Sequence, residues 1–507
     1  MSTTLGFDRI YYFGDSLTDS DEIFAASSAV AFFGIPPLAA GYAGQFSNGD
    51  VYADLVPDLI GVEGGEALNY AVGGAQALTD RTIQEILPPQ IIRPDARAED
   101  LAFGVDYQAQ VDRFLADTAG DDLSDAAVSV LIGLNDFGDV DPLSLITAQD
   151  PVQVAFLWGA QIAQSTLEST VNFAIAGVGT IILNTVPETP VFPFNEQSPE
   201  VFQLLGPVVT AGYNTTLLAG VAALEAAGAE VIVVDYGAMF EEVDRNSDSF
   251  GFQLFDQQFL LGSQGSGGIN PDFAAIPFNQ VAFYDSVHPT AELHEIMAAF
   301  QAESLTSKVE IGTAADEDIK GTKGDDLVLG RDGNDDIAMS NGDDVAIGGR
   351  GNDVIAGGNG NDLIDGSNGN DHLLGGNGND ILSDGTGTDV SKGGNGDDLL
   401  IDGAGSDMAF GGNGADAFIF TQAAVRGRDT DGMDYFDGGR GYDTLVLRLA
   451  DVDMDLGITQ QGSTTIYDTL GLTTTSIEEV LIIGATEVPE LGGFEDALAT
   501  ADLWHLV

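Results

Sequence analysis

A serine in a tight turn is the first residue whose setting suits chemistry. The apolar segment Arg9–Phe13 predicts a strand, and the sequence Gly-Asp-Ser-Leu-Thr-Asp, which contains Ser16, follows at once. A turn after a strand of a parallel sheet presents its side chains at the carboxyl edge, where active sites form. Gly-Asp-Ser is also a common turn, and the Gly-x-Ser-x-Gly elbow of α/β-hydrolases occurs nowhere in the chain.

A nucleophilic serine needs a general base, and the sequence has four histidines. His372 lies in a glycine-rich repeat, His505 lies in the C-terminal tail, and His294 lies on a helix face that we expect to be solvated. The fourth, His288, follows Asp285 by three residues and precedes a predicted helix. That spacing lets the carboxylate orient the imidazole toward Ser16, as in a nucleophile–base–carboxylate triad. A capped surface histidine is the alternative.

An acyl-transfer site also needs fixed donors for the oxyanion. Asn135 follows the apolar strand predicted at Ala127–Ile132, so its amide is expected at the same sheet edge as Ser16. Gly74, in Asn-Tyr-Ala-Val-Gly-Gly, offers an unobstructed backbone N–H. A buried structural asparagine and a plain turn are the alternatives for these two residues.

These motifs together resemble the SGNH, or GDSL-type, hydrolase family over residues 8 to about 305, where its blocks occur in order. The segment from Asn184 to Pro190 is similar to a further, proline-bearing block. The resemblance implies a flavodoxin-like, three-layer α/β fold and ester hydrolysis through an acyl-enzyme without an organic cofactor. The resemblance implies Ser16 as nucleophile, His288 as base and Asp285 as its orienting carboxylate. It implies Gly74 and Asn135 as oxyanion donors, with Gly73 as the alternative to Gly74.

Alternating strand and helix patterns must position these residues. Predicted strands are Arg9–Phe13, Ala127–Ile132, Thr180–Asn184 and Glu230–Asp235. Predicted helices are Val51–Ile60, Tyr107–Thr118, Pro151–Ala176, Pro199–Ala227 and Thr290–Ser307. Apolar strands that alternate with helices predict a parallel sheet covered on both faces.

A nine-residue period begins near Gly321. One aspartate per period stays in phase except at Val425, where the register lapses before it returns. These aspartates are the candidate metal ligands: Asp326, Asp335, Asp344, Asp353, Asp362, Asp371, Asp380, Asp389, Asp398, Asp407, Asp416, Asp434 and Asp443. In each copy an in-phase glycine permits a positive-φ turn, and a short strand follows. The inward residues predicted for these strands are Val328, Ile337, Ile355, Ile364, Leu373, Leu382, Leu400 and Phe418. Stacked turns would align the aspartates in rows, which suits Ca²⁺.

The repeats resemble the RTX (repeats-in-toxin) parallel β-roll. That resemblance implies several structural calcium ions, each held between one repeat and the next but one, hence at most nine bridging pairs in eleven unbroken repeats. Ala346, Ser391 and Ala409 weaken the inward position, and Met339, Asp384 and Asp402 replace the leading glycine. We expect those layers to be looser or unoccupied. A disordered Gly/Asp linker is the alternative, but linkers do not hold a period.

The composition indicates which binding partners the protein favours and where the chain divides into parts. Sixteen basic and 81 acidic residues give a net charge of −65, which disfavours nucleic acid as a partner and favours Ca²⁺. Without cysteine there are no disulfides to stabilise an exported protein. We expect neither a signal peptide at the N-terminus nor a transmembrane segment. The expected parts are a hydrolase domain (1–310), a β-roll (311–446) and a β cap (447–507), whose tail resembles a type I secretion signal.

The combined prediction is a secreted, extracellular, calcium-stabilised lipase or carboxylesterase exported by type I secretion machinery. Its substrate would be a lipophilic or acylated ester, bound near the apolar segments 24–42 and 186–202. A phospholipase or haemolysin-like acyl hydrolase and a carbohydrate acetylesterase are the enzymatic alternatives. A calcium-dependent adhesin or surface-layer protein is the non-enzymatic alternative.

Overall fold

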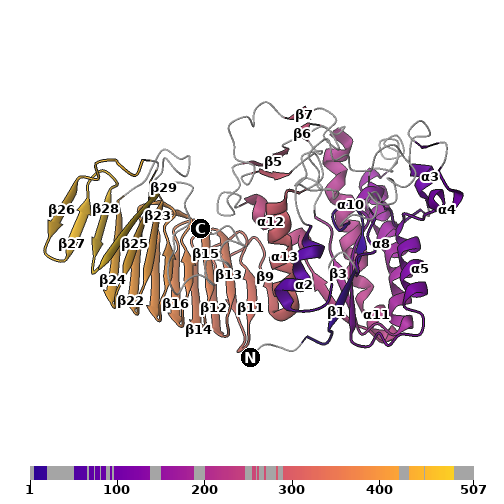
Figure 1. Ribbon diagram of the computed structural model, residues 1–507, viewed down its shortest axis with the longest axis horizontal. Helices are drawn as coiled ribbons and strands as arrows, with labels where there is room; N and C mark the ends of the chain where they lie inside the picture. The colour runs from indigo at the N-terminus through magenta and orange to yellow at the C-terminus, as the bar shows by residue number, and fades with distance from the viewer. Residues whose placement is uncertain are drawn as a thin grey trace. The chain divides into compact units, whose positions relative to one another are not determined.

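The computed structural model describes residues 5–19, 51–64, 68–72, 75–79, 81–86, 92–93, 96–137, 150–187, 200–245, 254–258, 260–261, 268–269, 281–283, 289–421, 433–449 and 451–484. The chain folds into two compact units, and the division along the chain falls between Leu305 and Thr306 (Figure 1). The first unit is α/β and the second is all β. Both fold classes predicted from the sequence are confirmed.

A four-stranded parallel sheet forms the centre of the α/β unit. Its strands lie in the order β1 (Arg9–Gly14), β2 (Ala126–Leu131), β3 (Thr180–Asn184) and β4 (Glu230–Val234). The predicted strands agree with these bounds within one residue. Gly14 pairs with Leu131 at the carboxyl end of β1, so the loops after β1 and β2 leave the sheet side by side.

Helices cover this sheet on both faces (Figure 1). The long ones are α2 (Tyr52–Ile60), α5 (Tyr107–Asp117), α8 (Pro151–Ala176), α10 (Glu200–Ala219), α11 (Val221–Ala227), α12 (Tyr236–Arg245) and α13 (Ala291–Thr306). Short helices α3 (Ile83–Ile86), α4 (Ala98–Leu101) and α6 (Leu134–Phe137) and strands β5 (Leu254–Gln258), β6 (Leu260–Leu261), β7 (Gly268–Ile269) and β8 (Val281–Phe283) complete the unit.

The predicted single helix over Pro199–Ala227 is wrong in one respect, because it breaks at Gly220 between α10 and α11. A side chain at Gly220 would meet Leu167 of α8 at 2.4 Å, so the helices approach closely there. By length and hydropathy, Leu204–Ala227 is also a candidate membrane span. Within the unit, however, it packs along α8 and buries Leu224.

His294 differs from its predicted solvated position. Its side chain is fully buried on α13, its Nδ1 accepts a hydrogen bond from the Tyr52 N–H at 3.3 Å, and its ring stacks on the Tyr52 ring. The glutamates beside His294 suggested an exposed face. Because α13 packs against the sheet and α2, the histidine turns inward instead.

The all-β unit is a roll of two sheets, in which the strands are parallel except for the antiparallel pairs β26–β27 and β27–β28 at one end. Roll sheet 1 contains β9 (Lys308–Ile311), β11 (Asp326–Leu329), β13 (Val345–Arg350), β15 (Leu363–Asn368), β17 (Ile381–Ser383), β20 (Leu399–Ile401), β23 (Ala417–Thr421), β25 (Thr444–Leu449) and β29 (Glu479–Gly484), with short β18 (Thr386–Gly387) and β21 (Ala404–Gly405). Roll sheet 2 contains β10 (Asp318–Lys320), β12 (Asp336–Asn341), β14 (Val354–Asn359), β16 (His372–Asn377), β19 (Val390–Asn395), β22 (Met408–Asn413), β24 (Asp434–Arg440), β28 (Leu472–Thr475), β27 (Thr464–Tyr467) and β26 (Ile458–Gln461).

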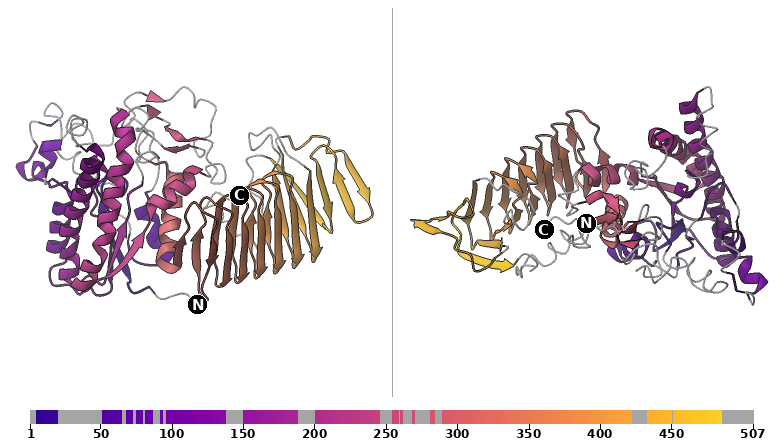
Figure 2. Two further views of the ribbon diagram at one scale, coloured as in Figure 1. Left: turned by 180° about the vertical axis from the view of Figure 1, so that it is seen from behind. Right: turned by 90° about the horizontal axis from the view of Figure 1, so that it is seen from above.

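Successive repeats alternate between the two roll sheets, so each strand pairs with the strand two repeats along (Figure 2). Ile337, for example, lies beside Ile355, eighteen residues on. Every predicted inward residue is buried and at most 2% exposed. At the turns, Gly360 has φ +132°, and a Cβ there would lie 1.6 Å from the Gly342 carbonyl oxygen. The stacking of turns therefore requires glycine at that position.

Candidate active site and calcium-binding turns

Ser16 lies two residues beyond β1 in a turn that Asp15 organises. The Asp15 carbonyl accepts hydrogen bonds from the N–H groups of Thr18 (3.1 Å) and Asp19 (3.0 Å), and its carboxylate accepts one from Leu17 (3.2 Å). Ser16 itself is 9% exposed. The serine is thus held at the carboxyl edge of the sheet, as predicted.

Gln110 of α5 anchors the residue at which this turn begins. Its Oε1 accepts from the Gly14 N–H (3.0 Å), and its Nε2 donates to the Gly14 carbonyl (2.7 Å). A Cβ on Gly14 would lie 2.3 Å from the Leu131 carbonyl oxygen, so only glycine fits. The base of the serine turn is therefore fixed by one buried amide and by the close approach of β2.

The segment 69–72 runs beside β1 on the side opposite β2. The Tyr70 N–H donates to the Tyr12 carbonyl (2.8 Å) and the Val72 N–H to the Gly14 carbonyl (3.2 Å). The Asn69 side chain donates to the Thr18 carbonyl at 2.6 Å, which ties this segment to the serine turn. The predicted oxyanion glycines, Gly73 and Gly74, follow Val72 directly but lie outside the described residues.

Asn135 lies in α6, at the end of β2. Gly133 precedes it with φ +119°, and a Cβ there would meet the Tyr213 ring at 2.8 Å. The Asn135 Nδ2 donates to the Ala75 carbonyl (3.1 Å), and its backbone carbonyl accepts from Gln76 Nε2 (3.2 Å). One amide hydrogen thus fixes the side chain, and the second hydrogen of the same NH₂ group remains for a further acceptor.

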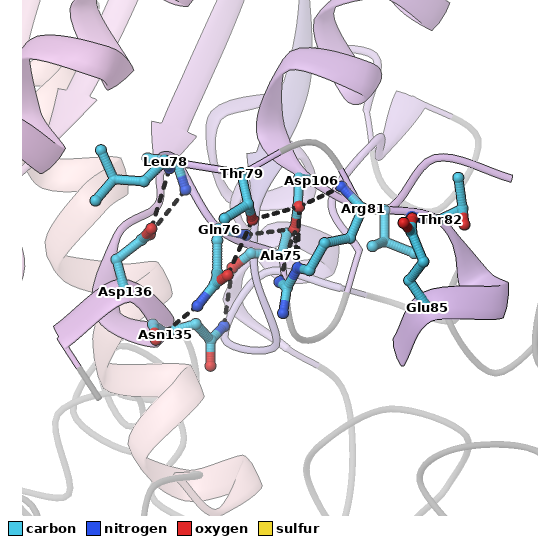
Figure 3. A network of polar contacts seen from close by, with 12 residues as sticks. Ala75, Gln76, Leu78, Thr79, Arg81, Thr82, Glu85, Asp106, Asn135 and Asp136 are labelled. Atoms are coloured by element: carbon cyan, nitrogen blue, oxygen red, sulfur yellow. Dashed lines mark hydrogen bonds and ion pairs between the residues drawn. The ribbon is translucent and has the colours of Figure 1, made fainter. Parts of the chain in front are cut away.

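Two buried carboxylates hold the loop that contacts Asn135 (Figure 3). The Asp136 carboxylate accepts the N–H groups of Ala77 (2.7 Å) and Leu78 (3.0 Å). The Asp106 carboxylate accepts the Gln76 N–H (2.9 Å) and pairs with the Arg81 guanidinium at 2.7 Å. Because charged hydrogen bonds are stronger than neutral ones, this network makes a rigid support for the Asn135 amide.

In the second unit, the in-phase aspartates form two rows along the turns. Each is at most 3% exposed. Along each row the backbone N–H of one aspartate donates to Oδ1 of the aspartate eighteen residues later, as from Asp353 to Asp371 at 2.8 Å. The step lengthens to 27 residues from Asp407 to Asp434 and from Asp416 to Asp443.

The second carboxylate oxygen, Oδ2, of most of these aspartates shows whether the rows suit calcium. Within the described residues the buried Oδ2 atom accepts no hydrogen bond in Asp335, Asp344, Asp353, Asp362, Asp371, Asp380, Asp389, Asp398, Asp416 and Asp443. A row of buried carboxylate oxygens without donors is costly unless a cation or protons neutralise it. The donor set, which consists of carboxylates beside turn carbonyls, is the one that Ca²⁺ prefers.

The same burial perturbs the acid–base behaviour of the rows. For eight of the aspartates, removal from water is the largest cause that raises the pKa of the carboxyl group, and the bond from a backbone N–H partly offsets it. The pKa rises to about 8 for Asp371 and Asp398, about 7 for Asp344, Asp362, Asp389 and Asp416, and about 6 for Asp353 and Asp380. In the absence of metal, Asp371 and Asp398 would therefore hold protons near neutral pH.

Family models match both units of the chain. The GDSL-like lipase/acylhydrolase model matches residues 10–300. The chain belongs to the GDSL-like lipase/acylhydrolase family. The model for RTX calcium-binding nonapeptide repeats, which holds four copies, matches three times in succession, over 311–346, 347–382 and 383–418. The protein is thus an ester-cleaving GDSL hydrolase that carries RTX calcium-binding repeats.

Comparison with solved structures gives only distant similarity. LAE5, an α/β hydrolase from the metagenome of Lake Arreo, Spain, is 14% identical at a TM-score of 0.26, over 60% of this chain and 96% of its own. Extracellular lipase LipA from Serratia marcescens is 14% identical at a TM-score of 0.13, over 70% of this chain and 74% of its own. No curated protein matches the sequence.

The GDSL hydrolase unit places two of the predicted site residues, Ser16 and Asn135, on loops that leave adjacent strands. The predicted base His288 and its partner Asp285 lie outside the described residues. Sequence reasoning missed Gln110, Asp106 and Asp136, whose buried side chains position backbone rather than face substrate. For Asp136, the sequence did offer a signal, because it follows Asn135 directly after an apolar strand. Only Asn135 of this polar pair was predicted to belong to the site.

Proposed function

We propose that the hydrolase unit cleaves carboxylic esters through an acyl-enzyme on Ser16, with His288 as base and Asp285 as its orienting carboxylate. The observation that carries this proposal is the pairing of Gly14 with Leu131, because it brings the serine turn and the Asn135 loop to one sheet edge. His288 removes the Ser16 proton as Oγ attacks the carbonyl carbon. It then protonates the leaving alcohol, and water reverses both steps.

The oxyanion formed in each step is assigned to three donors: the backbone N–H groups of Ser16 and Gly74, and the Asn135 side chain. For Asn135 this role uses the amide hydrogen that does not donate to Ala75. The Asp136 carboxylate supports it indirectly, because it fixes the N–H groups of Ala77 and Leu78 in the loop that contains Ala75. Donors held in place before the reaction need no reorganisation when charge develops.

A lipophilic ester is the substrate class that the rim of the unit favours. The first turns of α8 expose Val152 (56%), Phe156 (36%) and Leu157 (56%), and the first turn of α10 exposes Leu204 (69%). Both helices follow strands of the parallel sheet and so begin at its carboxyl edge. The indole of Trp158 in the same turn of α8 donates to the Asp136 carbonyl at 3.4 Å. This apolar surface therefore adjoins the loop that carries Asn135.

That surface favours a lipase or carboxylesterase over a carbohydrate acetylesterase, since sugars present hydroxyl groups rather than acyl chains. A phospholipase or haemolysin-like acyl hydrolase is the second candidate. Between Arg113 and Arg245 the sequence has no lysine or arginine, so this part of the unit would not attract an anionic headgroup.

The experiment compares the wild-type chain with Ser16→Ala on chromogenic esters of increasing acyl length. We expect hydrolysis by the wild type, with preference for longer chains, and complete loss in the variant. Ser124→Ala is the matched control, because this exposed serine lies in the loop before β2 and at its amino end. Labelling of Ser16 by an organophosphonate would exclude an inert adhesin or surface-layer role. Full turnover by Ser16→Ala would overturn the assignment.

For the second unit, we propose that the in-phase aspartates bind calcium ions between turns, and that the protein is exported by type I secretion and folds its roll outside the cell. The unpartnered Oδ2 atoms support the first part. The proposed segments are 1–310 for hydrolysis, 311–446 for calcium binding and 447–507 as cap and secretion signal. Circular dichroism of the full chain with Ca²⁺ or EGTA tests the roll, and an unchanged spectrum would contradict metal-coupled folding.

A further inference from the structure

Two turns of the roll carry an aspartate where most of the other repeats have glycine. In most repeats the first residue is glycine, and it lies against the row of aspartates. A Cβ at Gly375, for example, would come within 2.3 Å of Asp380 Oδ2. In two repeats on the row that precedes roll sheet 2, that first residue is Asp384 or Asp402. A carboxylate at this position must lie beside the row.

The structure brings these two aspartates into two groups of three carboxylates. Asp384 groups with Asp389 and Asp407, and Asp402 groups with Asp407 and Asp434. Within each group the oxygens lie within 4.8 Å of one another. All five side chains are buried, and none is more than 6% exposed. Asp407 belongs to both groups, so the two lie in consecutive layers.

A second observation indicates that the first group binds a cation. Asp389 is 1% exposed, and its Oδ2 accepts no hydrogen bond within the described part of the chain. The one basic side chain described between Arg350 and Arg440 is Lys392, which is exposed on β19. Buried carboxylates at this density are costly unless a cation or protons neutralise them, and Ca²⁺ suits a set of oxygen ligands.

We propose that Asp384 and Asp402 are additional calcium ligands, which make the two layers at Asp389, Asp407 and Asp434 the tightest Ca²⁺ sites of the roll. This inference rests on the proposed calcium binding by the in-phase aspartates. Each ordinary layer of a row adds one carboxylate, whereas each of these two layers adds two. The ligand charge per layer thus doubles from −1 to −2 and equals the charge of one Ca²⁺.

These sites would fill first as the calcium concentration rises, because affinity in oxygen-ligand sites increases with the number of charged ligands. The two sites lie along the turns that precede β19, β22 and β24. The strands beside these turns pair in register in both sheets, with Leu382 beside Leu400 in roll sheet 1 and Ser391 beside Ala409 in roll sheet 2. The layers with Asp384 and Asp402 in place of the leading glycine, expected from the sequence to be looser or unoccupied, would instead be the layers where folding of the roll begins.

The test is a titration of the full chain with chelator-buffered Ca²⁺, followed by circular dichroism and calorimetry. The variant Asp384→Gly/Asp402→Gly restores the residue that the other repeats use, so the strands retain their pattern. We expect the free Ca²⁺ at half-folding to rise about tenfold, since the stepwise affinity falls when charged ligands are removed. Calorimetry should show the loss of the earliest binding phase.

Terbium luminescence provides a local readout. Tyr435 directly follows Asp434, and its N–H donates to the Asp407 carbonyl at 2.9 Å, so its ring can sensitise a lanthanide in the second group. We expect substoichiometric Tb³⁺ to give tyrosine-sensitised emission in the wild type. That emission should fall in Asp402→Gly and in Tyr435→Phe, while Tyr435→Phe keeps the Ca²⁺ midpoint.

The matched control is Asp397→Asn, which removes one negative charge from an exposed turn position where other repeats have asparagine, as at Asn379. Equal midpoints for the double variant and this control would overturn the inference. So would tighter binding in the double variant, which would mean that the extra carboxylates only repel one another. If the glycine variant does not fold at saturating Ca²⁺, Asp384→Asn/Asp402→Asn takes its place. A wild-type chain that binds no Ca²⁺ would instead refute the proposed function of the repeats.

Discussion

Replacement of Gln110 by alanine should disable the hydrolase without any change in a residue that touches the ester. The Gln110 side chain is buried, and its amide bonds to both backbone groups of Gly14 and to the Val105 carbonyl. Truncation leaves the buried Gly14 N–H without its acceptor and opens a small cavity. One unsatisfied buried group costs about 1–3 kcal/mol, and the lost packing adds to it, so we expect a loss of about 2–4 kcal/mol in unfolding free energy.

The kinetic effect follows from the distance along the chain, since Ser16 is only two residues beyond Gly14. A displacement of about 1 Å at a reacting atom costs about 10²-fold in rate. We therefore expect kcat/KM on a short chromogenic ester to fall about 10²-fold, measured well below the melting temperature. Active-site titration gives the fraction of folded enzyme, so loss of protein is separated from loss of geometry.

The matched control is Gln161→Ala, because this glutamine is exposed on α8. It should leave both kcat/KM and the melting temperature close to wild-type values. Activity of Gln110→Ala within twofold of the wild type would refute the idea that this amide sets the serine turn.

Three further outcomes are expected. Asn135→Ala should lower kcat about 10²–10³-fold with little change in KM, measured on the same ester, because an oxyanion donor acts mainly in the transition state; an unchanged kcat would remove Asn135 from the site. Phe156→Ser/Leu157→Ser should reduce hydrolysis of an emulsified long-chain ester while a dissolved short ester is cleaved at the wild-type rate, and equal losses on both would contradict a role in lipid contact. In EGTA, acidification from about pH 8 to about pH 5 should increase the strand content of the roll measured by circular dichroism, because folded carboxyl groups such as Asp371, whose pKa is raised to about 8, bind more protons than the unfolded chain in that range; a constant or decreasing strand content would contradict it.

The sequence predicted those features that repeat or that lie next to one another in the chain. Strand bounds were correct within one residue because the apolar runs are short and bounded by turns. The roll followed from the nine-residue period and from the resemblance of the repeats to the RTX β-roll. The meeting of Ser16 and Asn135 was predictable because both residues follow strands whose carboxyl ends share an edge.

Contacts between distant segments were beyond the sequence. Gln110 and Gly14 are 96 residues apart, and nothing in the helix pattern distinguishes this glutamine from an ordinary polar residue. His294 was placed wrongly because its neighbours are charged, although α2 covers its side of α13 through Tyr52. The break at Gly220 depends on how closely Leu167 of another helix approaches, which a single segment does not reveal.

The eighteen-residue spacing of paired strands limits how such a protein can change its length. Loss of a single nonapeptide would transfer every later strand to the other roll sheet and misalign both aspartate rows. Removal of two consecutive nonapeptides would keep every later strand in its own roll sheet. The longer step from Asp407 to Asp434 keeps strand alternation, with the extra residues between the end of β23 at Thr421 and the start of β24 at Asp434. Lineages of this roll are therefore expected to grow and shrink by duplication or deletion in units of two repeats, with odd changes tolerated only as loops.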